Sequence, residues 1–293
     1  FKQNDLQPIK LQKISTQQVS QKVEERICNL VKMLWPEDGT LSAITIAAPG
    51  FVDANNGMII RAVNIPGWEY LPLMKIVEEK FGIPVFIEND ARLAALGEWR
   101  YGAGRGHHNL IYLTIGTGIG GGVIINDRLL TGSRGMATEL GHTVIWPEGP
   151  ICSCGQKGHL EAISSGTAIA RFVENEIKSG TKSSLTDLKS ITSKEVAEAA
   201  LAGDTLCRLA FTRAGTFLGK AVSNFLHTFN PTCVVFGGGV SLSGDLLFGP
   251  MQKEMERITI SKEYIKDLTI SQAKLGDNVG LIGGLVLVEN KIC

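Results

Sequence analysis

The sequence has no excess of charge of either sign, and this argues against some classes of partner. Lys plus Arg and Asp plus Glu number 29 each, which gives a formal net charge of zero. Proteins that hold nucleic acid or an anionic membrane through a broad electrostatic surface carry a marked excess of basic residues. A small ligand bound at a local site therefore fits the composition better.

Long hydrophobic runs are also missing from the sequence. The longest ones, at 110–115 and 279–288, are too short to span a bilayer, and no secretory signal is visible. The six cysteines do not form a disulfide framework, because three of the four outside one compact cluster fall within helical or strand patterns. We therefore predict a soluble protein of the cytoplasm that does not contact membranes.

The hydrophobic pattern predicts an α/β protein with two lobes, since 293 residues exceed what one core usually covers. Helices expected at 15–36 and 71–81 alternate with strands expected at 41–48 and 85–88. We place the lobe boundary near 102–108. The predicted division is a small N-terminal lobe at 1–107 and a larger C-terminal lobe at 108–278.

In the second lobe the pattern predicts a hairpin followed by helices. A strand at 109–115, a glycine loop at 116–122, a strand at 123–125 and a turn at 126–127 make up the hairpin. A long helix over 206–229 is stopped by Asn230-Pro231, and a buried strand at 232–236 follows. The polar segment 179–193 is expected to be a surface loop.

Two glycine-rich segments could hold a phosphate or a nucleotide. Residues 116–121 match the dinucleotide pattern G-x-G-x-x-G, but that fingerprint needs a following helix, and here a strand follows. Backbone N–H groups and the Thr117 hydroxyl could still cradle a phosphate, although a plain tight turn explains the loop equally well. Gly237-Gly238-Gly239, after a buried strand, suits an adenosine. Two such loops in one lobe favour a nucleotide.

Residues 139–161 combine two carboxylates, Glu139 and Glu161, with a cluster of soft metal ligands. A disulfide between Cys152 and Cys154 would be strained, so the pair is interpreted either as metal ligands or as two unrelated buried thiols. Four ligands would close a structural zinc site and leave both carboxylates for a polar small molecule. The predicted ligands are His142, Cys152, Cys154 and His159.

Asn89-Asp90 lies where the strand expected at 85–88 meets the next helix. Asp90 could simply cap that helix. It could also be functional, because the helix start keeps a carboxylate ionised and the carboxyl end of a strand faces a ligand crevice. An ionised carboxylate there can accept a proton from a substrate hydroxyl, and Asn89 could bond to neighbouring hydroxyls.

Together these motifs make the whole chain resemble the ROK group of sugar kinases and related repressors, within the actin-like ATPase and sugar kinase superfamily. The zinc segment with its upstream Glu-x-Gly-His is nearly diagnostic of that group. The motifs are Ala48-Pro49-Gly50, Asn64-Ile65-Pro66-Gly67-Trp68, Glu88-Asn89-Asp90, the glycine loop 113–122, Glu139-x-Gly141-His142, the Cys-x-Cys-Gly segment from Cys152, and Phe236-Gly237-Gly238-Gly239.

The resemblance implies a two-lobed actin-like ATPase (ribonuclease H-like) fold, in which sugar and ATP meet in an interlobe cleft beside a structural Zn2+. The last helix, within 279–293, would pack on the first lobe. Asp90 would be the catalytic base on the sugar hydroxyl, commonly that on C6, with Mg2+ on the phosphates. The implied sugar contacts are Gly50, Asn64, Asn89, Asp90, Glu139, His142 and Glu161, and the nucleotide contacts are Thr117, Gly118, Gly238 and Gly239.

The sequence departs from the family pattern in two places. The first phosphate loop of the family, an Asp-x-Gly-Gly-Thr-like hairpin, should precede Phe1, so we expect a missing amino-terminal segment. His159 stands where a third cysteine is common. Histidine is a suitable zinc ligand, and we expect a Cys2His2 site.

The sequence thus predicts a cytoplasmic, ATP-dependent hexose kinase of carbohydrate metabolism and glycolysis. Glucose is the first expectation, because residues 64–68 resemble glucokinase-like members; N-acetylmannosamine, N-acetylglucosamine, fructose and allose stay open. A sugar-responsive repressor with an upstream DNA-binding domain is the main alternative, although no recognition helix or basic patch is visible here. A zinc-stabilised sugar-binding protein without turnover is another. We expect a homodimer or homotetramer.

Overall fold

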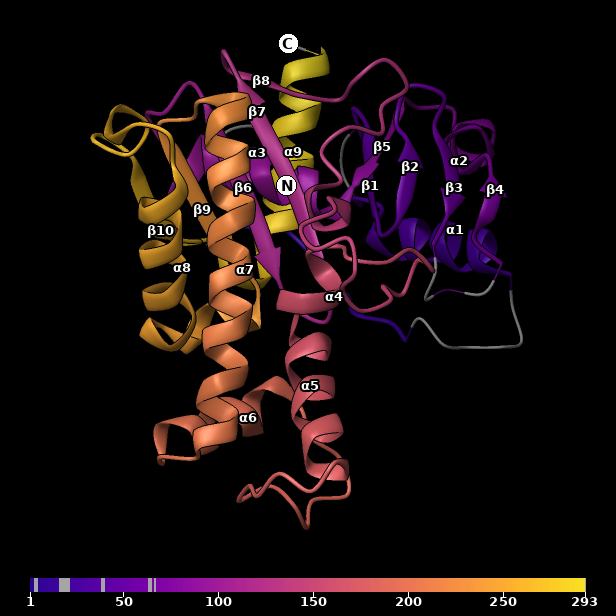
Figure 1. The fold of residues 1–293 in the computed structure, drawn as a ribbon. Coiled ribbons are helices and arrows are strands. Elements are labelled where there is room, and N and C mark those ends of the chain that lie inside the picture. Colours follow the sequence, from indigo (N-terminus) through magenta and orange to yellow (C-terminus); the bar gives the residue numbers. More distant parts are fainter. Residues whose placement is uncertain (3–4, 16–21, 38–39, 63–64, 66, 293) are drawn as a thin grey trace.

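The structure is a computed structural model, and it describes residues 1–2, 5–15, 22–37, 40–62, 65 and 67–292. The α/β class is confirmed (Figure 1). The strands are β1 Ile44–Ala48, β2 Phe51–Asp53, β3 Met58–Arg61, β4 Glu69–Leu71, β5 Val85–Asn89, β6 Leu110–Ile115, β7 Ile119–Ile125, β8 Arg128–Leu129, β9 Cys233–Gly237 and β10 Thr269–Gln272.

Helices separate most of these strands. The α-helices are α1 Val23–Leu34, α2 Leu73–Phe81, α3 Asp90–Tyr101, α4 Glu161–Ser164, α5 Gly166–Lys178, α6 Ser193–Leu201, α7 Thr205–Phe229, α8 Asp245–Ile258 and α9 Val279–Ile292. The 3-10 turns are η1 Leu140–His142, η2 Gly239–Ser243, η3 Lys262–Tyr264 and η4 Gly276–Asn278.

In the described residues the strands form a five-stranded sheet of order β10-β9-β6-β7-β8, a parallel pair β1-β5 and an antiparallel sheet β2-β3-β4. Strand β6 pairs antiparallel with β7 and parallel with β9, so the expected hairpin at 109–125 is confirmed within a mixed sheet. Asn126 and Asp127, with φ of 49° and 63°, form the next turn, which joins β7 to β8. Both residue types tolerate this left-handed conformation.

Most expected elements are present, with shifted ends. The first helix is described from Val23, and the part of it expected at 16–21 lies outside the described residues. Helix α7 ends as predicted, because Asn230 adopts the left-handed conformation (φ 44°) and Pro231 follows it. No helix or strand lies between α5 and α6, as expected for the polar segment 179–193.

The expectation of a glycine loop over 116–122 is wrong for its second half. Residues 119–122 belong to β7, and Gly120 and Gly122 pair with β6. These glycines permit close packing rather than a turn: a Cβ at Gly120 would lie 2.8 Å from Ala91 Cβ, and one at Gly122 would lie 2.5 Å from Ala95 Cβ. Strand β7 therefore lies directly on helix α3.

The five-stranded sheet is covered by helices on both faces. Alternate side chains of β6 point in opposite directions: Ile111, Leu113 and Ile115 join the core under α7, whereas Leu110 and Tyr112 join the core under α3 and α9. In Figure 1 α7 lies in front of this sheet and α9 behind it. A strand buried on both faces reads as a continuous apolar run, which is how β6 appears in the sequence.

Helices α3 and α9 approach each other through their backbones. A Cβ at Gly283 would lie 1.8 Å from the Leu93 carbonyl oxygen, and one at Gly97 would lie 2.8 Å from the Val279 carbonyl oxygen. Helix α9 also contacts β1, where Thr45 Oγ1 donates to the Gly284 carbonyl at 3.1 Å. The end of the chain thus supports the helix that begins at Asp90, while the lobe division at 102–108 stays a prediction.

The described cysteines, Cys28, Cys152, Cys154, Cys207 and Cys233, are all free thiols. None of the helices in the described part of the chain is both long enough and apolar enough to cross a membrane.

Candidate functional site

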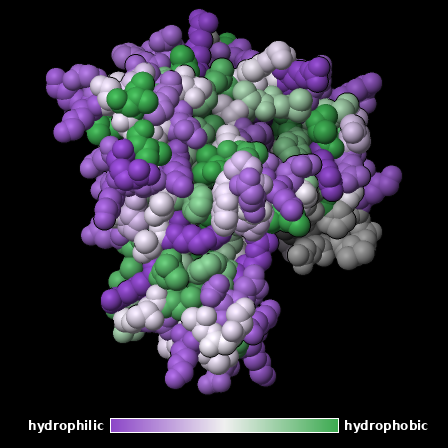
Figure 2. Space-filling view, in the orientation of Figure 1, coloured by the Kyte–Doolittle hydropathy of each residue, from purple (hydrophilic) through white to green (hydrophobic). Residues whose placement is uncertain are grey.

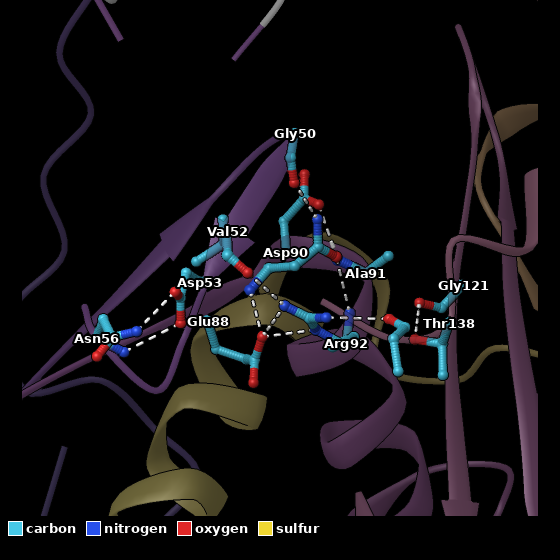
Figure 3. A network of polar contacts seen from close by, with 12 residues as sticks. Gly50, Val52, Asp53, Asn56, Glu88, Asp90, Ala91, Arg92, Gly121 and Thr138 are labelled. Carbon is cyan, nitrogen blue, oxygen red and sulfur yellow. Dashed lines mark hydrogen bonds and ion pairs between the residues drawn. The ribbon is translucent and has the colours of Figure 1, made fainter. Parts of the chain in front are cut away.

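Asp90 lies at the start of α3, directly after β5, but it does not cap the helix. The cap is Asn89, whose Oδ1 accepts hydrogen bonds from the backbone N–H groups of Ala91 (2.9 Å) and Arg92 (3.2 Å). The alternative that Asp90 serves only as a cap is therefore wrong. Asn89 Nδ2 also donates to the Gly50 carbonyl at 3.1 Å, which joins β5 to the turn after β1 (Figure 3).

The surroundings of Asp90 suit a side chain that accepts a proton from a substrate. Solvent reaches its side chain, yet the protein around it desolvates the carboxylate and raises its pKa, an effect that hydrogen bonds from the Ala91 and Asp90 N–H groups and the Arg92 charge partly offset. A carboxylate with a raised pKa is a stronger proton acceptor. A partly enclosed, solvent-reachable carboxylate is also what a substrate hydroxyl can approach.

Glu139 interacts with two carboxylates from other elements, Asp90 and Glu161. Burial raises the pKa of Glu139, His142 and Arg92 lower it, and the charges of Asp90 and Glu161 raise it again. Such mutual effects require proximity, because charge interactions in water decay over about 10 Å. The three carboxylates thus come from three parts of the chain: helix α3, the residue before η1 and the first residue of α4.

Glu161 is held by hydrogen bonds at both oxygens. Its Oε1 accepts from Ser153 Oγ at 3.0 Å and from Cys152 Sγ at 3.2 Å, and its Oε2 accepts from the Ile119 N–H at 3.0 Å. A Cβ at Gly118 would lie 2.4 Å from Oε2. Gly118, expected at the nucleotide, therefore lies against a carboxylate of the expected sugar site.

Asn64, also expected at the sugar, lies outside the described residues. The structure brings the other expected sugar contacts together: Asn89 bonds to Gly50, and Glu139 is influenced by Asp90, His142 and Glu161. The His142 ring also lies near β2, where the centroid of the Phe51 ring is 5.9 Å from the centroid of the imidazole. These carboxylates and the Asn89 amide suit a ligand rich in hydroxyl groups.

The expected metal ligands form one cluster. The ligand atoms of His142, Cys152, Cys154 and His159 all lie within 4.8 Å of one another. The two Nδ1 atoms are 3.3 Å apart, Cys154 Sγ lies 3.3 Å from His159 Nδ1, and Cys152 Sγ lies 3.7 Å from His142 Nδ1.

These distances fit zinc. A tetrahedral zinc with bonds of about 2.1 Å to nitrogen and 2.3 Å to sulfur places its ligand atoms about 3.3–3.8 Å apart. Burial and the neighbouring His142 charge lower the pKa of His159, which favours the neutral imidazole that a metal requires. Burial raises the pKa of the Cys152 thiol to about 11, so metal binding there would release a proton.

A cavity of about 960 Å³ lies on the other side of the 116–118 turn. Gly116 and Thr117 line it, as does Gly239 from the second glycine segment. Gly238, with φ of 82°, instead shapes the turn after β9, because a Cβ there would lie 2.4 Å from the Ile115 carbonyl oxygen. Two expected nucleotide contacts, Thr117 and Gly239, therefore share one cavity.

The walls of this cavity come from α5 and α6, which the sequence reasoning did not include. Gly166 at the start of α5 lies so close to the turn that a Cβ would be 2.9 Å from the Gly116 carbonyl oxygen. Thr192 and Glu195 form a capping box at the start of α6, and this Thr-x-x-Glu pattern was a readable signal of that helix start. In Figure 2 hydrophobic side chains gather where the projection formed by α5 and α6 meets the body.

Comparison with known proteins places this geometry in context. A sequence model of the ROK family matches residues 2–291. A glucokinase of Thermotoga maritima is 37% identical over 253 residues, covering 85% of this chain and 80% of the relative. A xylose repressor of Caldicellulosiruptor bescii is 33% identical over 248 residues, covering 84% of this chain and 62% of the repressor.

Among solved structures, a ROK family glucokinase from Streptomyces griseus in complex with glucose and AMPPNP superposes with a TM-score of 0.76. It is 34% identical, and the alignment covers 92% of this chain and 88% of that chain.

Proposed function

The chain belongs to the ROK family, and from this premise we propose that it is an ATP-dependent sugar kinase that converts glucose to glucose 6-phosphate. The observation that carries the proposal is the 116–118 turn. Gly116 and Thr117 line the cavity, while Gly118 lies against the carboxylate of Glu161. A nucleotide in the cavity and a sugar among the carboxylates would meet at this turn.

In the proposed reaction Asp90 accepts the proton of the sugar hydroxyl while the hydroxyl oxygen attacks the γ-phosphorus of ATP. The bond between that phosphorus and the β,γ-bridging oxygen breaks, and ADP leaves. Phosphoryl transfer asks the protein mainly to position the reactants and to neutralise charge, and Mg2+ bound to the phosphates would supply part of that neutralisation. Gly50, Asn64, Asn89, Glu139, His142 and Glu161 would hold the remaining hydroxyls. Thr117 and Gly239 would line the nucleotide side, Gly238 would shape the turn beside it, and Gly118 would lie at the boundary with the sugar.

The proposed metal is a structural zinc bound by His142, Cys152, Cys154 and His159. The bound ion would fix the segment that donates to Glu161 from Ser153, and it would orient the His142 ring. This role is one of positioning, since four protein ligands leave no open coordination site.

We further propose that the enzyme acts in the cytoplasm, at the entry of sugar into glycolysis, as a homodimer or homotetramer. Closed symmetric assemblies are the commonest form of soluble oligomers. Sedimentation analysis of the purified protein measures this directly.

The test of the kinase proposal is a coupled ADP-release assay with Mg-ATP and a panel of glucose, fructose, allose, N-acetylmannosamine and N-acetylglucosamine. Asp90→Asn is the matched control, because it keeps the shape of the side chain and removes the base. We expect turnover on glucose that the variant lowers by a factor on the order of a thousand. A folded full-length protein with no turnover on any of these sugars would reject the proposal.

The xylose repressor relative supports a second candidate, a sugar-responsive regulator of transcription. A regulator needs sugar binding but no base. If calorimetry finds sugar binding that Asp90→Asn leaves intact while the ADP-release assay stays silent, this second candidate gains over the kinase.

A further inference from the structure

Arg92 is a fully buried cation directly beneath Asp90. Its side chain is 1% exposed, and it heads the largest side chains that the described interior buries completely. Burial of a charge is unfavourable unless the charge is paired and its donors are satisfied. Arg92 meets both conditions, and the identity of its partners suggests a role beyond stability.

The guanidinium joins three separate segments. Nε and Nη2 lie 2.6 Å from Glu88 Oε1 on β5, Nη2 donates to the Val52 carbonyl on β2 at 3.3 Å, and Nη1 donates to the Ala137 carbonyl at 3.0 Å. Figure 3 shows the side chain with Glu88 and Val52 on one side and Thr138 on the other. The contact with Ala137 matters because Glu139 follows two residues later.

The segment from β8 to Glu139 lies against the β2–β3 turn at its outer end. Asn55 Nδ2 donates to the Ser133 carbonyl at 3.2 Å, and a Cβ at Gly135 would lie 2.8 Å from the Ala54 nitrogen. At the inner end Thr138 has a φ of 70°, which is unfavourable for a β-branched residue and persists only where its surroundings hold it. The Arg92 bond to Ala137 and the Thr138 Oγ1 bond to the Gly121 carbonyl (3.3 Å) provide that hold.

Arg92 also faces the carboxylates of the site. The charged and titratable groups that interact with Asp90 are Arg92 on its own helix, Glu139 before η1 and Tyr112 on β6. Against the effect of burial, the Arg92 charge lowers the pKa of both Asp90 and Glu139.

We propose that Arg92 is a positioning residue for the sugar: it ties the segment that carries Glu139 to the helix that carries Asp90, and so sets the distance between the two carboxylates. The inference rests on the proposed function, because it assigns the sugar to these carboxylates. A second consequence is electrostatic, since the same cation helps to keep the base ionised. A purely structural ion pair would have neither effect.

Two variants separate geometry from charge. Arg92→Lys keeps the charge but loses the planar fork that reaches three acceptors at once. Removal of the Arg92 charge alone would leave the buried Glu88 without its ion-pair partner, so the charge-free form is the double variant Glu88→Gln with Arg92→Met. Arg257→Lys is the control, because Arg257 also forms a double contact with a glutamate, Glu254, at 2.7 and 2.9 Å on α8.

The readouts are KM for glucose, KM for ATP and the pH dependence of kcat/KM, together with the thermal midpoint. For Arg92→Lys we expect the KM for glucose to rise about tenfold, the equivalent of one lost buried hydrogen bond, with KM for ATP and the acid limb unchanged. For the double variant we expect the same rise in the KM for glucose and an acid limb moved to higher pH. Arg257→Lys should change none of the kinetic values.

If both variants fold and keep the wild-type KM for glucose and acid limb, the positioning role is overturned while the kinase stands. If the wild-type protein phosphorylates no sugar, the proposed function fails instead. Glucose affinity measured by calorimetry then still decides the role of Arg92, because an unchanged affinity in Arg92→Lys would overturn it.

Discussion

The two sides of the 116–118 turn differ in the kinds of residue that line them. On the cavity side, Gly116 and Gly166 let the turn and helix α5 approach each other closely, and residues of α5 and α6 enclose about 960 Å³ of space. The other side is crowded with ionisable groups whose oxygens are held by hydrogen bonds, as at Glu161. One side therefore depends on space and the other on charge and orientation, and substitutions should damage them in different ways.

Loss of the metal cluster should affect the two sides of the turn most unequally, because the cluster supports only the side with the carboxylates. We expect Cys154→Ser to abolish zinc binding, to lower the thermal midpoint and to raise the KM for glucose on the order of a hundredfold, with a smaller effect on KM for ATP. Metal analysis and steady-state kinetics measure these effects. Cys233→Ala, in the core away from the cluster, should keep one zinc per chain, and equal metal contents in both variants would contradict the assignment.

Two glycine substitutions sharpen the comparison by acting on opposite sides of the same turn. A methyl group at Gly118 would press on Glu161 Oε2, and one at Gly166 would press on the Gly116 carbonyl. We expect Gly118→Ala to raise the KM for glucose about tenfold and Gly166→Ala to raise the KM for ATP about tenfold, each by a cost of roughly 1.4 kcal/mol in packing. If either variant raised the KM for glucose and the KM for ATP equally, the two sides of the turn would not be functionally distinct.

Two aspartates at helix starts should respond to pH with opposite signs. The folded-state pKa of Asp90 is raised by desolvation, so its ionised form lowers stability above that pKa, and this cost disappears as the pH falls through it. We expect Asp90→Asn to raise the thermal midpoint at neutral pH and to match the wild type at acid pH. Thermal melts across pH provide the measurement.

Asp204, the cap of α7, is the matched case. Desolvation alone would raise its pKa, but hydrogen bonds from the Cys207 and Ser184 N–H groups and nearby hydroxyls outweigh it and lower the pKa. Its contribution is present above the unfolded pKa and is lost as the pH falls. Asp204→Ala should therefore lower stability at neutral pH by about 1 kcal/mol, and a gain there would contradict the argument.

The smallest expected effect is at Ser153, an exposed side chain that orients Glu161. Ser153→Ala removes one hydrogen bond to Oε1, while the Ile119 N–H still holds Oε2. We expect the KM for glucose to rise about threefold, near the lower end of what one such bond contributes, with kcat and KM for ATP unchanged. Thr181→Ala, which removes a hydroxyl bond to the half-buried Glu176 on α5, is the control and should leave all three values unchanged.

Much of the fold could be predicted because its signals are local. The β6–β7 hairpin and the end of α7 at Asn230 follow from short patterns of turn residues and apolar periodicity. The metal cluster could be predicted because its ligands span only residues 142–159 and few other arrangements suit two thiols so close in sequence.

The rest depended on contacts between distant segments. Glycine in a strand and glycine in a turn are the same letter, so nothing local showed that Gly120 and Gly122 make room for α3. The cap could not be assigned to Asn89 rather than Asp90 without the helix start, which the sequence defines only to within a residue or two. Arg92 read as an ordinary helix residue, because its partners Val52 and Ala137 lie 40 and 45 positions away.

The backbone contact between α3 and α9 has a consequence for biosynthesis. Thr45 and Gly284 bond across 239 positions, and Gly283 covers Leu93 on the helix that begins at Asp90. During translation α3 emerges from the ribosome long before α9, so the apolar face of α3 stays exposed while the intervening chain is made. The nascent protein thus carries Asp90 early, but the support that holds α3 in place arrives with one of the last helices, and we expect activity to appear only once α9 has emerged.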